Sequence, residues 1–331
     1  MLITKPDYFD RFRCIAGSCP DSCCKEWDVQ VDEASASYYR SLSGDLGDRL
    51  REVLRTEDGE TVMTIIDGRC PMWRADGLCR IQAELGEAAL CKTCRDFPRL
   101  THDYGDFVEL GLELSCPEAA KFILAAGRPN TITLETDGGE APEYDVEAMD
   151  VLKSSREAAL DILFDASRSV PEALTLFLLY GYQAQAELDG EASRSFCPEA
   201  ALESAQELRK SGNFREMTDF FSGLELLTPE WASLLECPSP APWSEYLRAL
   251  AGYLTQRYWL QAVSDYDLYC RVKFIVISCL LVQHLGGDLF RTAQLFSKEI
   301  ENSIDNVEAI LDAAYCHPAF TDDRILGMLL E

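Results

Sequence analysis

The sequence has no long apolar run, few basic residues and little histidine. No segment of its 331 residues approaches the roughly 18–20 uninterrupted apolar residues that a membrane-spanning helix needs. The longest apolar stretch, residues 274–282, has about half that length and includes Ser278, which predicts a buried helix. The first residues lack a basic region followed by an apolar one, so we expect no signal peptide and a cytoplasmic location.

The shortage of basic residues excludes two classes of partner. Lys and Arg number 30 against 57 Asp and Glu, so the formal net charge is −27. Binding to phosphate backbones requires basic patches, so we expect neither nucleic acid nor an anionic membrane surface as a partner. The acidity is explained either by solubility or by attraction of a basic protein surface, and composition does not separate these explanations.

Cysteine, by contrast, is abundant and clustered. Nine of the 14 cysteines fall within the first 116 residues, in the pattern C-x4-C-x3-C-C, C-x8-C, C-x2-C and C-P. These nine are Cys14, Cys19, Cys23, Cys24, Cys70, Cys79, Cys91, Cys94 and Cys116. A reducing cytoplasm disfavours disulfides, so the clustering predicts metal ligation or redox chemistry. The other five, which we expect to be small buried hydrophobes, are Cys197, Cys237, Cys270, Cys279 and Cys316.

The spacing leaves the kind of metal centre open. Cys91 and Cys94 form a C-x2-C pair, which lets two sulfurs reach one metal. Zinc sites of the finger type show two such pairs, and His102 is the sole histidine in this region. An all-sulfur environment suits an iron–sulfur cluster at least as well as zinc. A standard radical site needs C-x3-C-x2-C, and Glu26 stands where its third cysteine would be.

Hydrophobic spacing predicts a mainly α fold in which a loop-rich, cysteine- and metal-binding N-terminal unit packs on a C-terminal helical bundle. We expect three parts: a cysteine-rich metal- or cluster-binding region at 1–127, a linker at 128–144 and a helical domain at 145–331. Strands are predicted at 28–32 and 60–67, a strand or short helix at 106–115, and helices at 34–55, 80–90 and 117–126. Nine further helices are predicted at 146–167, 171–189, 198–210, 214–226, 229–235, 243–264, 267–285, 288–300 and 307–314.

Several motifs resemble the flagellin lysine-N-methylase family. They are FRCIAGSCPDSCCKEWDV at 12–29, GLCRIQAELGEAALCKTCRDFPR at 77–99, LELSCPEAAKFIL at 112–124 and, more weakly, FSKEIENSIDN at 296–306. The stretch between Cys70 and Arg99 also resembles small domains that chelate iron or zinc. The resemblance implies a protein-lysine N-methyltransferase that moves a methyl group from S-adenosylmethionine to flagellin. It also implies a [4Fe–4S] cluster, with zinc as the alternative metal.

Carried over to this sequence, the family motifs make all nine clustered cysteines candidate ligands. We rank Cys19, Cys23, Cys91 and Cys94 first, then Cys70, Cys79 and Cys116, and then Cys24 and Cys14. A second hypothesis is a non-catalytic metal-binding or interaction protein with a structural zinc or iron–sulfur site.

The sequence marks neither the catalytic residues nor the S-adenosylmethionine site. A methyltransferase must bind the lysine as a neutral amine, by desolvation or with a base, because an ammonium has no lone pair. Residues near the cysteines that can take part are Glu113, Glu118, Asp96, Tyr104 and Trp27. None of them belongs to a recognised motif, and no glycine-rich fingerprint for the donor is present.

Overall fold

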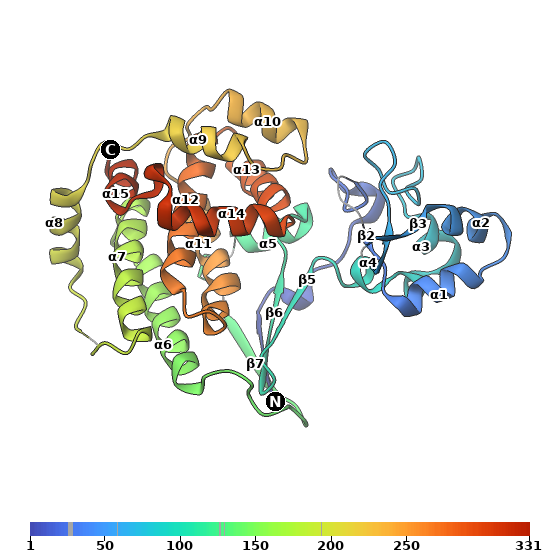
Figure 1. The fold of residues 1–331 in the computed structure, drawn as a ribbon, viewed down its shortest axis with the longest axis horizontal. Helices are drawn as coiled ribbons and strands as arrows, with labels where there is room; N and C mark the ends of the chain where they lie inside the picture. Colours follow the sequence, from blue (N-terminus) through green and yellow to red (C-terminus); the bar gives the residue numbers. More distant parts are fainter. Residues whose placement is uncertain (26–28, 58, 126, 129, 193) are drawn as a thin grey trace.

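The computed structural model describes residues 1–25, 29–57, 59–125, 127–128, 130–192 and 194–331. Fifteen α-helices and seven short strands among these residues confirm the predicted mainly α class. Figure 1 shows two lobes: a large lobe with most of the helices and a four-stranded sheet, and a small lobe that contains α1–α4 and β2–β4.

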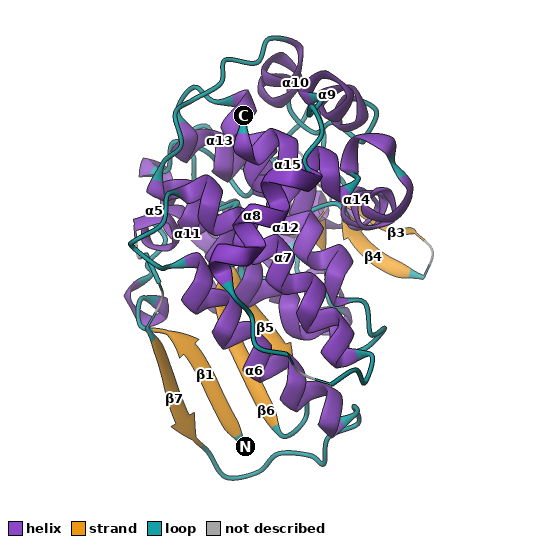
Figure 2. Cartoon of the chain, turned by 90° about the vertical axis from the view of Figure 1, so that its left-hand side faces the viewer, coloured by secondary structure: helices purple, strands orange, loops and turns teal. Residues whose placement is uncertain are grey.

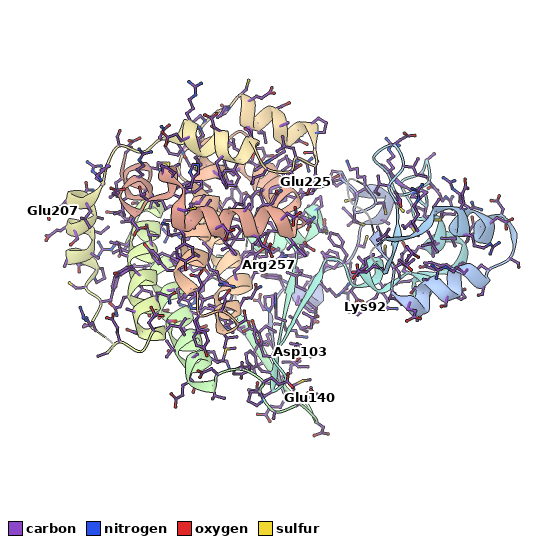
Figure 3. All side chains as sticks on the ribbon, in the orientation of Figure 1. Lys92, Asp103, Glu140, Glu207, Glu225 and Arg257 are labelled. Atoms are coloured by element: carbon purple, nitrogen blue, oxygen red, sulfur yellow. The ribbon has the colours of Figure 1, made fainter. Side chains whose placement is uncertain are left out.

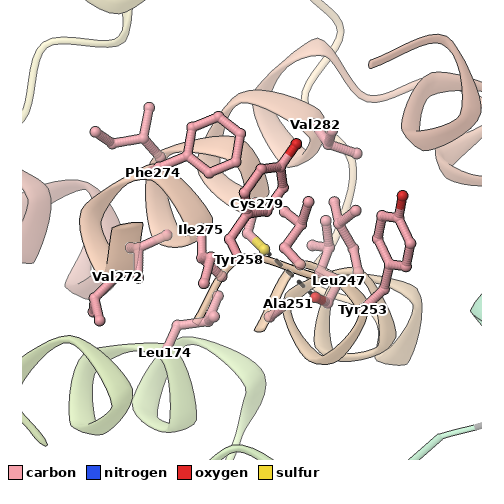
Figure 4. Packing of buried hydrophobic residues seen from close by; sticks show 14 of the residues in the cluster. Leu174, Leu247, Ala251, Tyr253, Tyr258, Val272, Phe274, Ile275, Cys279 and Val282 are labelled. Carbon is pink, nitrogen blue, oxygen red and sulfur yellow. Dashed lines mark hydrogen bonds between the residues drawn. The ribbon is translucent and has the colours of Figure 1, made fainter. Parts of the chain in front are cut away.

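Helix α12 (Leu268–Leu285) lies at the centre of the large lobe. Residues 274–282 are fully buried, which confirms the predicted buried helix. Figure 4 shows Cys279 of α12 next to Leu247, and its thiol donates a hydrogen bond to the Leu247 carbonyl at 3.5 Å. Within the described chain α12 alone is long and apolar enough to cross a membrane, and 83% of it lies inside the protein, as is usual for a core helix. The helices that pack against it are α7 (Val170–Leu188), α11 (Glu245–Tyr258), α13 (Leu289–Phe296) and α14 (Ile304–Cys316).

Polar caps fix where several helices of the large lobe begin. Ser169 and Glu172 form a capping box at the start of α7, and Asp145 accepts a hydrogen bond from the Ala148 amide at the start of α6. All nine helices predicted beyond residue 145 are present. The other helices of this lobe are α5 (Pro117–Ala125), α6 (Val146–Leu163), α8 (Pro198–Leu208), α9 (Phe214–Ser222), α10 (Pro229–Glu236) and α15 (Asp322–Leu330).

Two of the predicted helices end in a different helical form. Helix α11 continues as the 3-10 helix η4 (Trp259–Val263), and α13 continues as the π-helix η5 (Ser297–Glu301). All five residues of η5 are buried. A π-helical turn is rare and often marks a functional site, which draws attention to the charged residues that η5 carries.

The sheet of the large lobe joins segments from distant parts of the sequence. Its strand order is β5-β6-β1-β7, with β1 parallel to β6 and antiparallel to β7. Its strands are β1 (Leu2–Pro6), β5 (Arg99–Asp103), β6 (Phe107–Leu112) and β7 (Thr131–Glu135). The segment expected to be a linker, 128–144, therefore includes a strand that pairs with the start of the chain. Figure 2 shows β1, β6 and β7 side by side below the helices.

The small lobe has a hydrophobic core of its own. Tyr39, Leu50 and Met72 are almost completely buried in it, separate from the core of the large lobe. A three-stranded sheet of order β2-β4-β3 supports this core. Its elements are β2 (Val29–Gln30), α1 (Glu33–Ser41), α2 (Gly44–Val53), β3 (Leu54–Glu57), β4 (Glu60–Met63), α3 (Arg80–Leu85) and α4 (Lys92–Asp96).

The first 127 residues contribute to both cores. Tyr8, Phe12 and Phe107 belong to the large core, together with most of α5. The small lobe is thus an insertion: the chain leaves the large sheet after β1 and returns to it at β5 (Figure 1). The segment from Cys14 to Cys24, which we call the cysteine segment, lies at this junction.

Candidate functional site

The cysteine segment is fastened to both lobes. The carboxylate of Asp21 is buried, 2.8 Å from Lys25 Nζ, 3.2 Å from Arg291 of α13 and 3.4 Å from Lys298 of η5. On the other side, the Cys24 carbonyl accepts a hydrogen bond from the Cys70 amide at 2.7 Å. Burial alone would raise the pKa of Asp21, but the hydrogen bond from Lys25 and the charge of Lys298 lower it well below its usual range. Asp21 is therefore ionised and holds the segment against the large lobe.

The nine clustered thiols divide into two groups. Cys14, Cys19, Cys23 and Cys116 are within electrostatic reach of one another at the junction; we call them the junction thiols. Those of the small lobe, called the small-lobe thiols, are Cys24, Cys70, Cys79, Cys91 and Cys94. The two groups meet at the adjacent residues Cys23 and Cys24, whose thiols are hydrogen-bonded to each other, and Cys94 is also within reach of Cys23.

Two thiol pairs each contain one sulfur that ionises readily. A hydrogen bond from Cys23 lowers the pKa of Cys24 to about 7, and one from Cys94 lowers the pKa of Cys91 to about 7. Burial raises the pKa of Cys70 to about 12. Because the thiolate is the form that binds metal, Cys24 and Cys91 are the most readily available ligands in the small lobe.

The donor chemistry suits a sulfur-ligated metal centre, but the positions of the side chains do not form one. In the part of the chain that the structure describes, no three His, Cys, Asp or Glu side chains are arranged to hold a metal ion. Of the four cysteines ranked first from the sequence, Cys91 and Cys94 are neighbours in the small lobe, whereas Cys19 and Cys23 are junction thiols. The residue ranking stays a prediction.

Outside these two groups the cysteines are scattered over the large lobe. Cys270 and Cys279 are buried as expected, whereas Cys197, Cys237 and Cys316 are exposed and do not fit the expectation of buried hydrophobes. An exposed position is compatible with the sequence around these three, because they lie at or beside the ends of α8, α10 and α14.

The π-helix η5 brings buried charges into the large lobe. Oε1 of Glu301 lies 3.3 Å from Nη1 of Arg257 and accepts a hydrogen bond from the Tyr258 hydroxyl at 3.1 Å. Arg257 in turn donates to the Tyr253 hydroxyl at 2.8 Å. Lys298, on the same turn, reaches Asp21. One short helical segment thereby connects the cysteine segment to a buried network of charged and hydroxyl groups.

An open cleft of about 1010 Å³ separates the small lobe from the sheet. Both lobes contribute walls, among them Phe9, Leu100 and Leu110 of the large lobe and Val31 and Thr61 of the small lobe. Figure 3 labels Lys92, which lines the cleft from the small lobe, and Arg257, which lies inside the large lobe. The charged residues of the lining are Asp32, Glu33, Glu60, Asp96, Glu113, Arg40, Lys92 and Arg99.

Glu113 is the most unusual carboxylate in this cleft. It follows β6 directly, and its side chain is only 12% exposed. The cation nearest to the Glu113 carboxylate is Arg257, whose Nη1 lies 3.9 Å from Glu113 but only 3.3 Å from Glu301. The Glu113 carboxylate accepts no hydrogen bond from the described residues. Burial raises the pKa of Glu113 to about 7, although the charge of Arg257 opposes the rise. A buried carboxylate of this kind is able to exchange a proton near neutral pH.

A second cavity of about 370 Å³ lies beneath the sheet, between its strands and helices α6 and α11. Arg156 of α6 donates two hydrogen bonds, of 2.7 and 2.9 Å, to the Glu109 carboxylate. His102 and Arg156 both line this cavity, and His102 Nε2 and Arg156 Nε have no hydrogen-bond partner among the described residues. Burial and the charge of Arg257 lower the pKa of His102, so the imidazole is neutral. Buried polar atoms without partners indicate a place for a polar ligand.

The two cavities share a wall made by Leu100 and Leu110. On one side of this wall Glu113 faces the cleft, and on the other Arg257 and Tyr253 line the smaller cavity. A small molecule in the smaller cavity and a side chain entering from the open cleft would therefore lie on opposite sides of Leu100 and Leu110.

The other residues considered from the sequence have ordinary surroundings. Glu118 pairs with Lys121 at 2.5 Å on α5, and Asp96 pairs with Lys92 at 3.8 Å and Arg95 at 3.5 Å. The Tyr104 ring stacks on Phe107 with 4.6 Å between centroids. Burial raises the pKa of Tyr104. Trp27 and Glu26 lie outside the described residues.

Sequence reasoning missed Arg156, Arg257 and Glu301. Arg156 and Arg257 look like surface charges on amphipathic helices, so their sequence context gave no signal. Glu301 had a weak signal, because it belongs to the segment 296–306 that carries the family resemblance. The structure shows that this segment contains the last residue of α13, all of η5 and the first residues of α14.

Comparison with known proteins gives a partial match. A lysine-N-methylase of Salmonella typhimurium is 35% identical over 132 residues, which are 38% of this chain and 33% of that protein. The flagellar biosynthetic protein FliU of Salmonella muenchen is 34% identical over 132 residues, which are 38% of this chain and 78% of that protein. A lysine-N-methylase of Salmonella choleraesuis is 35% identical, with 33% of it covered. The chain thus spans a third of the two lysine-N-methylases. No family model matches the chain, and no solved structure matches it.

Proposed function

Since the chain belongs to the lysine-N-methylase family, which includes the flagellar biosynthetic protein FliU, we propose that it methylates lysine side chains of flagellin. The methyl donor in this proposal is S-adenosylmethionine, and the compartment is the cytoplasm. The observation that carries the proposal is the pair of cavities that adjoin at Leu100 and Leu110, because methyl transfer needs a donor site and an amine site next to each other.

We place the donor in the smaller cavity. Its volume of about 370 Å³ falls in the range usual for small-molecule sites. The free Nε–H of Arg156 and the neutral imidazole of His102 supply hydrogen-bonding groups for a polar ligand. Glu109 is held by Arg156 through both of its carboxylate oxygens, so this charged pair presents a fixed surface to the ligand.

The lysine enters through the open cleft and reaches Glu113. In the ground state its ammonium has no lone pair, so one proton must leave before the reaction. The Glu113 carboxylate takes that proton, and desolvation in the cleft favours the neutral amine. The nitrogen lone pair then forms the N–C bond while the C–S bond of the donor breaks, and its electron pair stays on sulfur. The products are a methylated ammonium and a neutral thioether.

The small-lobe thiols, together with Cys23, support a metal centre as part of the same proposal. The residues that would hold a [4Fe–4S] cluster, or zinc instead, come from the small-lobe thiols, with Cys23 as their neighbour from the junction group. When bound, such a centre supplies electron transfer or a structural cross-link. The proposed proton and methyl transfers use only Glu113 and the walls of the two cavities.

A methylation assay tests the proposal. Protein purified without oxygen is incubated with flagellin and S-adenosylmethionine labelled in its methyl group, and label on lysine is measured by mass spectrometry. We expect Glu113→Gln to lower the rate about 10²–10⁴-fold, as loss of a general base does. Glu118→Gln, the matched control on α5, should leave it unchanged.

The competing hypothesis of a non-catalytic metal-binding or interaction protein predicts a different result. Such a protein, fully loaded with metal, would neither label flagellin nor release heat when it is titrated with S-adenosylmethionine. This outcome would overturn the methyltransferase proposal.

A further inference from the structure

Strand β5 is an edge strand of the sheet in the large lobe. The strand order β5-β6-β1-β7 gives it one neighbour, β6. The register pairs Leu100 with Gly111 and His102 with Glu109. Just beyond the ends of the strand, the Glu113 amide donates to the Pro98 carbonyl and the Tyr104 amide donates to the Phe107 carbonyl. Residues 98, 100, 102 and 104 therefore direct their main-chain polar groups toward β6.

The other residues of β5 direct their main-chain polar groups away from the sheet. In an antiparallel pair the residues between hydrogen-bonded positions point their N–H and C=O groups outward. In β5 these are Arg99, Thr101 and Asp103, and none of their main-chain groups has a backbone partner in the described parts of the chain. Their side chains are exposed as well. Such an edge is a template for another extended strand.

This edge borders the cleft that leads to Glu113. Arg99, Leu100 and Thr101 all line the cleft. Figure 3 labels Lys92 beside the start of β5 and Asp103 at its end, so the strand runs from the cleft along the side of the sheet. A segment paired with β5 would therefore lie beside the cleft at Arg99–Thr101, the part of the strand that lines it.

The charge of the cleft favours a basic guest. Its lining contains five carboxylates and three cations. The whole chain carries a formal charge of −27, so pairing of this edge with a second copy would bring two strongly acidic proteins together. A segment of another protein that carries a lysine is the complementary occupant.

We infer that β5 binds an extended, lysine-bearing segment of the protein substrate as an added strand, with the lysine side chain directed into the cleft. The inference rests on the proposed function and adds to it the manner in which the substrate is held. Main-chain hydrogen bonds supply affinity in this mode, and the pocket beside the edge selects the side chain. It follows that the site selects unfolded or extended segments rather than helices.

Two substitutions at one position test the inference. Thr101→Pro removes the outward N–H, whereas Thr101→Val keeps it and removes only the hydroxyl. Proline is tolerated at the outward-facing positions of edge strands because no ladder bond within the sheet is lost. The probe is a fluorescein-labelled ten-residue flagellin peptide with one central lysine, and anisotropy measures its binding without a methyl donor. We expect at least a tenfold loss of affinity for Thr101→Pro and less than a twofold change for Thr101→Val.

Modified peptides on the unmodified protein keep the inference testable if Thr101→Pro does not fold. One version of the peptide carries methyl groups on the backbone amides of its odd-numbered residues, and the other carries them on the amides of its even-numbered residues. Only one of the two methylated peptides should lose affinity, because only every second amide of an added strand faces β5. Equal binding of both versions and of the unmodified peptide would overturn strand pairing.

The outcomes separate this inference from the proposed function. Methyl transfer to flagellin that is unaffected by Thr101→Pro would overturn strand pairing and leave the methyltransferase proposal standing. Parity-dependent peptide binding without any methyl transfer would support strand pairing and overturn the methyltransferase. A concentration-dependent dimer that Thr101→Pro abolishes would show that a second copy occupies the edge, and would overturn the inference.

Discussion

Nζ of Lys298 lies 3.4 Å from the carboxylate of Asp21, although the two residues are 277 positions apart in the sequence. Lys298 is on the π-helix η5 and Asp21 is within the cysteine segment, and both side chains are at most 4% exposed. The contact joins the two regions of the sequence that resemble the same family, and it fixes the cysteine segment to the buried charge network of the large lobe.

Removing this buried carboxylate should destabilise the protein. We expect Asp21→Ala to lower the free energy of unfolding by about 3 kcal/mol, because it removes the buried carboxylate that faces the charge of Lys298. Urea unfolding followed by circular dichroism measures the change. Asp10→Ala is the control, since that carboxylate pairs with Lys5 but is 66% exposed, and it should cost less than about 1 kcal/mol. Equal effects of the two substitutions would contradict the prediction.

Glu113 should make stability depend on pH in a specific direction. Its pKa is about 7 in the folded protein against an ordinary value of 4.5, so the folded state holds the proton more tightly than the unfolded state. Stability conferred by the neutral form is therefore full below about pH 4.5 and is lost as the pH rises through about 7. Glu113→Gln mimics the neutral form and should stabilise the protein at pH 8 by up to about 3 kcal/mol, with no gain at pH 4.

Thermal unfolding of both proteins at pH 4 and pH 8 measures this difference. Glu118→Gln serves as the control, because Glu118 pairs with Lys121 and should show no such gain at pH 8. A pH-independent effect of Glu113→Gln would show that burial does not raise the pKa of this carboxyl.

Single Cys→Ser substitutions should affect metal content by group. We expect Cys24→Ser, Cys91→Ser and Cys94→Ser to lower the iron or zinc content of protein purified without oxygen, because these sulfurs are close neighbours and two of them ionise near pH 7. Iron, zinc and sulfide analysis together with visible absorbance gives the measurement. Cys316→Ser is the control, since Cys316 is exposed on the large lobe. Unchanged metal in all three variants would remove the small-lobe thiols as ligands.

The smaller cavity, beneath the sheet, should bind the methylation product. His102→Ala removes a buried ring nitrogen, Nε2, that has no hydrogen-bond partner among the described residues, so it should weaken binding of S-adenosylhomocysteine about tenfold while changing stability little. Isothermal titration calorimetry measures the affinity. Arg156→Lys should weaken binding further, because lysine does not reproduce the two-point contact with Glu109.

Arg128→Lys is the matched control for the arginine substitution, since Arg128 pairs with Glu157 and Asp161 on the surface. It should leave the affinity unchanged. Full affinity in His102→Ala and Arg156→Lys would place the donor elsewhere.

Local pattern was enough to predict most helices but few of the strands. Helix α7 was predicted to within a residue at each end, because its apolar spacing and the Ser169 cap are contained in its own sequence. Strand β1 was predicted as loop, because its partners are remote: Leu2 pairs with Phe107 on one side and with Glu135 on the other. The five residues of β1 therefore have no local sequence pattern that predicts a strand.

The same limit applies to the site. The clustered cysteines were visible because their spacing is local, and the structure brings Cys24 near Cys91 and Cys94. The pairing of Arg257 with Glu301 depends on the packing of α11 against the end of α13, which no window of sequence contains. The raised pKa of Glu113 likewise arises from burial, and its sequence neighbours do not reveal it.

The chain enters and leaves the small lobe at one place. The guanidinium of Arg99, at the start of β5, lies over the ring of Phe12 with 5.3 Å to the ring centroid, so the outgoing and returning connections of the small lobe are in contact. The two backbone connections to the small lobe therefore run next to each other and together form one hinge. Movement of the small lobe about this axis would widen or narrow the cleft without changing the large sheet, so the opening available to a protein substrate depends on two short stretches of backbone.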